Sequence, residues 1–344
     1  MSISNVDIAG SGISLGLTLY SLTNEWWERK YDLDEMLAQV SQRGLGPGIE
    51  IVGFQSIRNF PDVEDAFVTH WRDLLDGHEL RPTCLSSNID VKLRADRVLT
   101  TDEMVDYLNR QLETAHKLGF RTVRVQIGAS TDVLRRCLPT AEKYGITMGM
   151  EIHAPESANS PTICKVRDFY AEIGSPLLGF IPDFSSTMRT IPPTELDSLR
   201  RQGLSDDNLA GLLDEWRNGQ GNSFERYHRW ADSARRSGAP ATAVGNAMMV
   251  FTMHGREPMQ TWAELAGQIV HVHGKCYEFD TAGEEPAIDY AEAAKILTGA
   301  GFTGWISTEW EGHAFLLPEE ADGFDMVAKQ QSLTRRSIAA ALAH

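Results

Sequence analysis

The sequence has no long apolar run and few cysteines. No stretch of about eighteen apolar residues occurs among its 344 residues, which excludes a membrane-spanning helix. The first residues, MSISNVDIAGSG, lack the basic-then-apolar order of a secretory signal peptide. The four cysteines form no CxxC pair, so we expect reduced thiols and a cytoplasmic protein. They are Cys84, Cys137, Cys164 and Cys276.

Positive charge is also scarce. Lysine and arginine total 32 against 48 aspartates and glutamates, which gives a formal net charge of −16. Such a chain repels polyanions, so nucleic acid and anionic membranes are excluded as partners. The remaining composition, 42% hydrophobic and 23% charged, is typical of a globular protein that buries a sizeable core.

Strand-like and helix-like patterns alternate along most of the chain. Amphipathic stretches at helical spacing separate eight short apolar runs, and several begin at a capping residue such as Asp32, Thr101 or Ser130. No GxGxxG follows the first run, which argues against a doubly wound sheet. We therefore predict an α/β fold, a single (β/α)₈ TIM barrel that spans residues 1–344. The expected strands lie near Ile13–Leu19, Gly48–Phe54, Pro82–Ser86, Thr122–Ile127, Thr147–Ile152, Leu177–Pro182, Ile269–His273 and Gly304–Thr308.

One segment, at about 187–260, interrupts this alternation between the sixth and seventh expected strands. It contains helix-like sequence, including DDNLAGLLDEWRN and SFERYHRWADSARR. Insertions at the catalytic face of a barrel often become lids or partner surfaces. An apolar stretch with Met248, Met249, Phe251 and Met253 favours a contact surface. The alternative is a helical excursion packed on the barrel wall.

Four of the apolar runs end abruptly on carboxylates or imidazoles. The carboxyl ends of parallel barrel strands meet at one mouth, and this ligand mixture suits Mn²⁺, Zn²⁺ or a similar ion. Any one of these acids could be a salt-bridge partner, and a lone strand histidine is more often a core residue. Four such ends together predict one metal site. Their side chains are Glu151 and His153, then Asp183, then His271 and His273, and finally Glu309, Glu311 and His313.

The four ends resemble the ligand pattern of the xylose isomerase-like sugar isomerase and epimerase barrels. The matching segments read EIH, PDF, HVH and STE. The resemblance implies that the metal ligands are Glu151, Asp183, His273 and Glu309. Manganese is the expected ion, with Mg²⁺, Co²⁺ and Zn²⁺ as alternatives.

A narrower resemblance rests on EIHAP, SPLLGFIPDFS, HVHGKCYEFD and ISTEWEGH. These segments are similar to the large, metal-binding subunits of C-glycoside deglycosidases, although a glycine is more usual than Ser185–Ser186 after PDF. The resemblance implies cleavage of the C–C bond between a 3-oxo sugar and an aromatic aglycone. It also implies a hetero-oligomer with a small all-β partner, the beta subunit.

The same strand ends provide candidate catalytic groups. We expect His153 to be the acid/base, because imidazole titrates near neutral pH; the alternative is a hydrogen-bonding role beside Glu151. Metal-bound Glu309 is a second candidate base, as the epimerase resemblance implies. Lys275 shares a strand face with His273 and is expected to hold a sugar hydroxyl or an enolate oxygen. Its alternative is a rim salt bridge.

Further residues are expected to bind the substrate. Glu311 and His313 complete the last strand end, where they face the substrate or orient the ligands. An aromatic wall for the aglycone, or alternatively a core cap, is expected from Tyr20, Trp26 and Trp27. The remaining candidates for contacts with the sugar are Arg189, Gln126 and Asn88.

The leading prediction is a metal-dependent carbon–carbon lyase that acts on 3-oxo C-glycosides. The alternative enzyme is a ketose 3-epimerase or sugar isomerase with the same metal site. A third possibility, a catalytically silent scaffold or sugar-binding barrel, is disfavoured by the four intact ligand candidates.

Overall fold

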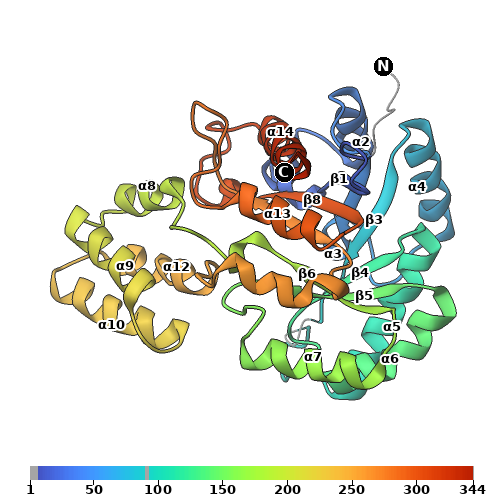
Figure 1. Ribbon diagram of the computed structural model, residues 1–344, viewed down its shortest axis with the longest axis horizontal. Helices are drawn as coiled ribbons and strands as arrows, with labels where there is room; N and C mark the ends of the chain where they lie inside the picture. Colours follow the sequence, from blue (N-terminus) through green and yellow to red (C-terminus); the bar gives the residue numbers. More distant parts are fainter. Residues whose placement is uncertain (1–6, 90–92, 344) are drawn as a thin grey trace.

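The chain folds into a barrel of eight parallel strands surrounded by helices, which confirms the predicted fold (Figure 1). The computed structural model describes residues 7–89 and 93–343. Neighbouring strands are hydrogen-bonded in the order β6-β5-β4-β3-β2-β1-β8-β7. Their apolar runs suit strands that are covered on both faces. The strands are β1 (Ile13–Thr18), β2 (Gly48–Val52), β3 (Arg81–Ser86), β4 (Thr122–Val125), β5 (Thr147–Ile152), β6 (Leu178–Pro182), β7 (Val272–Cys276) and β8 (Gly304–Trp310).

Helices follow the strands and cover the outside of the barrel. As predicted, Asp32 and Ser130 cap α2 and α6 through their side chains, whereas α5 is capped by Thr100 and not by Thr101. The α-helices around the barrel are α1 (Thr23–Trp27), α2 (Leu33–Gln42), α3 (Gly53–Ser56), α4 (Asp65–Gly77), α5 (Thr101–Leu118), α6 (Thr131–Tyr144), α7 (Pro161–Ile173), α13 (Tyr290–Gly299) and α14 (Gly323–Leu342). Short 3₁₀ turns follow β1, β6 and β8, namely η1 (Leu19–Leu22), η2 (Phe184–Ser186) and η4 (Gly312–Ala314).

The barrel closes between β6 and β7 without a continuous ladder. Two isolated parallel bridges join the two sides, one between Phe180 and Ile269 and one between Asp183 and His273. Within the described residues, backbone pairing at this seam therefore consists of isolated bridges and not of a continuous ladder.

A glycine makes the close approach at the seam possible. A Cβ atom on Gly179 would lie 2.3 Å from Val270 Cγ1 and 2.7 Å from the carbonyl oxygen of Gln268. Both distances are far below van der Waals contact. Without a side chain at this position, the Val270 N–H reaches the Phe180 carbonyl at 3.0 Å.

The segment between β6 and β7 forms a helical lobe beside the barrel, on the left in Figure 1. Trp216, Trp230 and Phe251 are buried in this lobe. The predicted contact surface is therefore wrong for Phe251, whereas Met248 and Met249 are each 36% exposed. The elements of the segment are α8 (Pro193–Arg201), α9 (Asp206–Asn218), α10 (Ser223–Arg236), α11 (Ala241–Asn246), α12 (Met248–Thr252) and η3 (Met259–Gln268).

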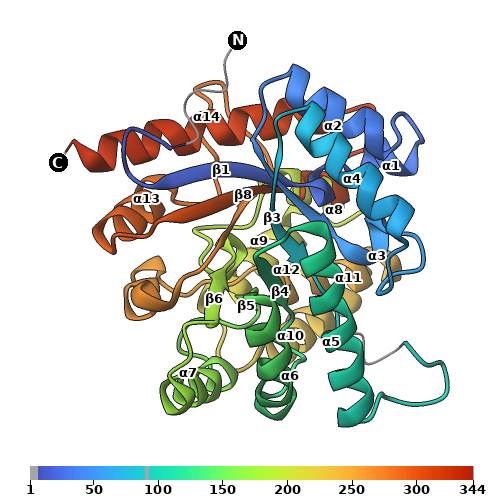
Figure 2. The same cartoon turned by 90° about the vertical axis from the view of Figure 1, so that its right-hand side faces the viewer.

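The C-terminal helix α14 lies along β1 and β8 (Figure 2). Gln331 donates to the Gly16 carbonyl at 3.3 Å, and the Thr308 hydroxyl donates to Gln330 Oε1 at 2.5 Å. Across residues 7–89 and 93–343, neither α14 nor another helix has both the length and the apolar composition needed to cross a bilayer. All four cysteines are free.

Candidate metal centre

Four side chains from four strand ends converge at the mouth of the barrel. Glu151 lies in β5, Asp183 directly follows β6, His273 lies in β7 and Glu309 lies in β8. One potential ligand atom from each lies within 4.8 Å of the other three. The structure thus brings together the four residues that the sequence singled out as ligands.

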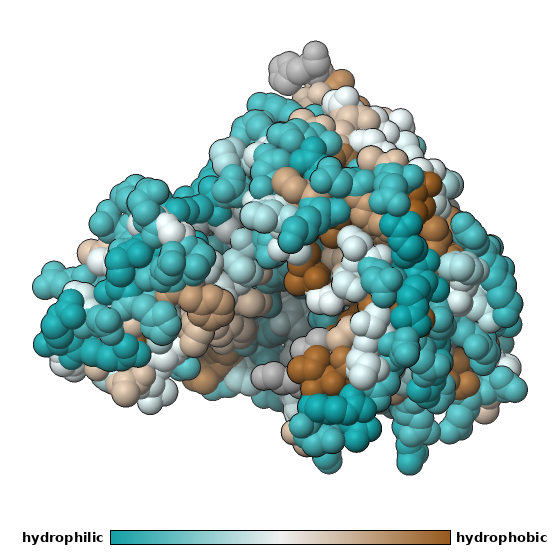
Figure 3. Space-filling model, turned by 90° about the horizontal axis from the view of Figure 1, so that it is seen from below, coloured by the Kyte–Doolittle hydropathy of each residue, from teal (hydrophilic) through white to brown (hydrophobic). Residues whose placement is uncertain are grey.

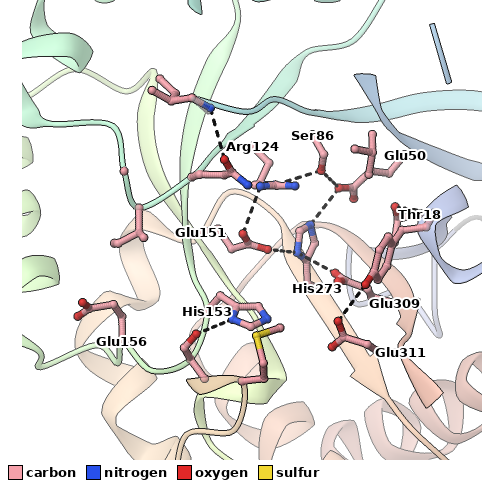
Figure 4. Close-up of a pocket in the computed structure, with 18 of the residues that line it drawn as sticks. Thr18, Glu50, Ser86, Arg124, Glu151, His153, Glu156, His273, Glu309 and Glu311 are labelled. Carbon is pink, nitrogen blue, oxygen red and sulfur yellow. Dashed lines mark hydrogen bonds and ion pairs between the residues drawn. The ribbon is translucent and has the colours of Figure 1, made fainter. Parts of the chain in front are cut away.

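His273 directs one ring nitrogen at the three carboxylates. Its Nδ1 atom lies 2.8 Å from Glu151 Oε1 and 3.0 Å from Glu309 Oε2 (Figure 4). Asp183 Oδ2 lies 3.9 Å from the same nitrogen. Asp183 Oδ1 accepts the Ser185 N–H at 2.6 Å, whereas its buried Oδ2 accepts no hydrogen bond and has the Lys275 ammonium 3.2 Å away. An acceptor of this kind fits a cation ligand.

The local charge balance also fits a divalent cation. Five carboxylates lie in or against the cluster together with two permanently charged cations and the His273 ring, so two negative charges remain in excess even when that ring is protonated. The carboxylates are Glu50, Glu151, Asp183, Glu309 and Glu311, and the cations are Arg124 and Lys275. Oxygen and imidazole donors are ligands that Mn²⁺, Zn²⁺ and related ions accept, so this donor set could hold one such ion.

The acids of the cluster differ in their ionisation. Burial raises the pKa of Glu309 against the opposing charges of Lys275 and His273. Burial also opposes ionisation of Glu151, but the nearby Arg124 and His273 hold its pKa well below the usual range. Burial opposes the ionisation of Glu311 too, but the charge and hydrogen bond of Lys275 together with the nearby imidazoles hold its pKa at about 2.

Lys275 does not face the cavity as the sequence analysis expected. Its side chain is fully buried behind the carboxylates, and Nζ lies 2.7 Å from Glu309 Oε1 and 3.0 Å from Glu311 Oε2. The strand alternation correctly places it on the face of His273. However, three carboxylates, with Asp183 as the third, surround the ammonium and keep it from the solvent.

Two charged residues that the sequence analysis missed lie in the wall of the site. Glu50 of β2 and Arg124 of β4 both line the cavity, and Arg124 Nη1 lies 3.4 Å from Glu151 Oε2. Each is a single charged residue inside an otherwise apolar strand, GIEIV and TVRV. That pattern was the available signal, because a charge in a buried strand needs a partner or a function.

A cavity of about 620 Å³ opens above the centre. His153 lines it beside Glu156, and its Nδ1 donates to the Ala154 carbonyl at 2.7 Å (Figure 4). In the neutral imidazole this hydrogen bond places the proton on Nδ1 and leaves the Nε2 lone pair free. His153 is therefore arranged to accept a proton.

Part of the cavity wall is apolar. Phe54 and Ile127 line it and are 58% and 38% exposed, and Met253 adds a side chain from the end of the helical lobe. Seen from below, the molecular surface is hollowed between the lobe and the barrel, with hydrophobic side chains beside the hollow (Figure 3). The cavity therefore combines a charged floor with an apolar margin.

The other candidate substrate contacts are divided between the cavity and its surroundings. Gln126, Glu311 and Tyr20 line the cavity, and the Tyr20 hydroxyl donates to Glu311 Oε1 at 3.0 Å. His313 instead packs its ring against Tyr20, with ring centroids 5.0 Å apart, so it supports the wall from behind. Burial lowers the pKa of His313 to about 4.

Three further expectations are not met by the positions of the side chains. Arg189 is exposed and forms an ion pair with Asp289 instead of lining the cavity. Asn88 accepts the Tyr107 hydroxyl at 3.3 Å and serves the local structure. The two tryptophans of α1, Trp26 and Trp27, line a separate small pocket beside the cavity.

Comparison with known proteins gives one family match and full-length relatives. The model of the family described as "xylose isomerase-like TIM barrel" matches residues 38–330. The chain is 43% identical to a C-glycoside deglycosidase alpha subunit of Arthrobacter globiformis, over 96% of this chain and 94% of the relative. It is 36% identical to a 3'-dehydrocarminate deglycosidase alpha subunit of a Microbacterium species, over 94% of each. The crystal structure of an IOLI protein with a binding zinc atom shares the fold, with a TM-score of 0.55 at 12% identity over 94% of this chain and 98% of that chain.

Proposed function

Because this chain belongs to the xylose isomerase-like TIM barrel family and is related over almost its whole length to deglycosidase alpha subunits, we propose that it is the metal-dependent catalytic subunit of a C-glycoside deglycosidase. The proposed reaction is cleavage of the C–C bond between a 3-oxo sugar and its aromatic aglycone. The coarser assignment, an enzyme that acts on sugars, follows from the family itself.

The observation that supports this proposal is the division of the cavity into two parts. Carboxylates and an imidazole gather at its floor, where a sugar with several oxygens would bind. The exposed apolar side chains at its margin suit an aromatic ring. A substrate that joins a polar sugar directly to an aromatic group matches both parts, and the name of the Microbacterium relative refers to a substrate of the 3'-dehydro type.

The residues that would hold the ion are Glu151, Asp183, His273 and Glu309. A divalent ion bound there would act as a Lewis acid toward the C3 carbonyl and C2 hydroxyl oxygens of the sugar. Lys275 holds Glu309 and Glu311 in place, and Arg124 holds Glu151 from the other side of the wall. These contacts fix the carboxylates before a substrate arrives.

The chemistry at the sugar is an elimination. The ketone at C3 acidifies the C2–H bond, and His153 Nε2 accepts that proton. The electron pair then forms the C1–C2 double bond as the C1–aryl bond breaks, and the aryl carbon takes up a proton. No water is consumed and no redox partner is needed. Glu309 is the alternative base, since burial raises the pKa of its carboxyl group.

The competing candidate is a ketose 3-epimerase that uses the same ion and base. A free ketose has no aromatic group, so it would leave the margin formed by Phe54, Ile127 and Met253 in contact with water. The apolar margin therefore favours the C-glycoside.

A partner chain is part of the proposal, because the relatives are named alpha subunits. We propose a small beta subunit, and the exposed Met248 and Met249 of the helical lobe are candidates for contact with it. Copurification from the native host tests this directly. Manganese as the ion and the cytoplasmic location stay predictions.

The decisive experiment uses the purified chain with and without the beta subunit. Incubation with a 3-oxo C-glucoside and Mn²⁺ should release the free aglycone, and a chelator should stop the release. If the aglycone is still released at the full rate by protein that metal analysis shows to be free of metal after chelation, the reaction does not depend on a metal. Conversion of a free ketose without aglycone release would favour the epimerase instead.

A further inference from the structure

Glu50 lies directly beneath the metal centre and contacts both histidines of β7. Its Oε1 atom lies 3.0 Å from His273 Nε2 (Figure 4). Its Oε2 atom lies 3.0 Å from His271 Nε2. Ser86 donates its hydroxyl to Glu50 Oε1 at 2.5 Å. The Glu50 side chain is completely buried, so these three donors are the groups that satisfy its carboxylate.

The hydrogen bonds determine how each imidazole is oriented. An ionised carboxylate only accepts hydrogen bonds, so both histidines donate their Nε2–H to Glu50. In His273 this leaves Nδ1 directed at Glu151, Asp183 and Glu309.

We propose that Glu50 is a positioning residue, which fixes the ring of His273 so that Nδ1 is already aimed at the cation before the cation binds. The inference deepens the proposed function, since it concerns the same metal site. A carboxylate behind a ligating imidazole sets the tautomer and the ring orientation. His271 is then not a ligand, but a second donor that keeps the Glu50 carboxylate in one position.

A second ion beneath the first is the competing explanation. Ligand atoms of Glu50, Cys84 and His271 also lie within 4.8 Å of one another. However, both Glu50 oxygens already accept hydrogen bonds, and burial raises the pKa of the Cys84 thiol well above its usual value. The thiolate that a metal would need is therefore disfavoured.

The test compares two substitutions of buried glutamates. Glu50→Gln places an amide where two imidazoles donate, whereas Glu195→Gln changes another buried glutamate, which contacts His254 and belongs to neither group of potential metal ligands. Competition against a chelator should show Mn²⁺ bound about 10- to 100-fold more weakly by Glu50→Gln, with the Glu195→Gln protein unchanged. An unchanged Mn²⁺ affinity in Glu50→Gln, or two ions bound per chain in the wild type, would overturn the inference.

A second readout does not depend on metal binding. In the metal-free wild-type protein, the hydrogen-bonded Nε2–H protons of His271 and His273 should appear as protected downfield imidazole resonances. At least one should disappear in Glu50→Gln, because the amide keeps only one acceptor oxygen, and both should persist in Glu195→Gln. Persistence of both in Glu50→Gln refutes the positioning role. If the wild type binds no ion, the proposed function fails, and this measurement still tests Glu50. If the Glu50→Gln protein does not fold, Glu50→Asp takes its place. This variant keeps the charge but shortens the side chain, and it should also bind Mn²⁺ more weakly than the wild type.

Discussion

Two histidines that reach the cavity use their ring nitrogens in opposite ways. His273 donates through Nε2 to Glu50 and directs Nδ1 into the cluster of carboxylates. His153 donates through Nδ1 to the Ala154 carbonyl and leaves Nε2 free for the cavity. The hydrogen-bond partner, and not the residue type, therefore decides which ring nitrogen of each histidine is left for the cavity or the carboxylates.

Replacing the proposed base should separate turnover from metal binding. His153→Ala is expected to lower kcat by about 10²- to 10⁴-fold, because a positioned proton acceptor is lost. Its Mn²⁺ content should equal that of the wild type, since His153 lies outside the four-residue cluster. The measurements are aglycone release from a 3-oxo C-glucoside and metal analysis of the same sample. Turnover at the wild-type rate would exclude His153 as the base and favour Glu309.

His313 should make stability depend on pH. Its pKa lies at about 4 in the folded protein, because burial disfavours the charged ring, and near 6.5 in the unfolded chain. Between these values the unfolded state binds more protons, so the free energy of unfolding falls as the pH drops from 6.5 toward 4. The loss is up to about 3 kcal/mol, and above pH 6.5 this residue contributes no slope.

Urea unfolding across this pH range checks the prediction. His313→Phe keeps an aromatic ring against Tyr20 and Trp310 and should flatten the dependence. The exposed His116, replaced by phenylalanine, is the control and should leave the slope as in the wild type. Equal slopes in all three proteins would contradict the assignment to His313.

Strand-end chemistry identified the residues of the cluster from sequence, but not the residues that support it. Glu151, Asp183, His273 and Glu309 were visible because each ends an apolar run. Glu50 lies in the middle of its strand, and its partners are His271 and His273, more than 200 residues away in sequence. Hydrogen-bond pairing over such separations depends on barrel register, which the local pattern does not contain.

At the scale of the elements, the ends of the strands could be predicted where an apolar run stopped. The predicted Thr147–Ile152 is β5 itself, and its neighbours differ by one or two residues. β7 was predicted at Ile269–His273 but spans Val272–Cys276, because Gly274 and Lys275 continue the pairing with β8. The sequence pattern did not show this part of the strand, because Gly274 is small and Lys275 is charged. A buried lysine needs acidic partners, and those of Lys275 come from other strand ends.

The seam between β6 and β7 should be sensitive to a single methyl group. Gly179→Ala would place its Cβ against Val270 and the Gln268 carbonyl, and we expect it to destabilise the fold by about 1–3 kcal/mol. Gly299→Ala is the matched control, because a Cβ at that helical glycine meets no atom within 4 Å. Urea unfolding of both variants measures the difference. If Gly179→Ala and Gly299→Ala were equally stable, the residues around Gly179 would be able to accommodate a methyl group, and the prediction would be wrong.

For the molecule as a whole, the cluster concentrates negative charge that only folding brings together. Four strands contribute the four potential ligands, and the unfolded chain has no such site. A cation that binds the folded chain alone must therefore stabilise the entire barrel.

This coupling predicts a metal-dependent stability. Mn²⁺ at 100 times its Kd should raise the free energy of unfolding by about 2.7 kcal/mol, and a chelator should reverse the gain. Glu151→Gln should abolish the response. Glu156→Gln, a change in another cavity-lining glutamate outside the cluster, should preserve it. Urea titrations with and without Mn²⁺ provide the measurement, and a full response in Glu151→Gln would exclude it as a ligand.

The incomplete ladder between β6 and β7 has a consequence for how this architecture could change over evolutionary time. Asp183 and His273 face each other across that seam, at the two ends of the segment that forms the lobe. A cation bound by both residues would link the end of β6 to β7. It would add an ionic contact to the few backbone hydrogen bonds that close the barrel there. The segment between Asp183 and His273 can therefore become longer without opening the barrel. The seam is therefore the place where a barrel of this kind could acquire a new lobe and, with it, a new wall for its substrate.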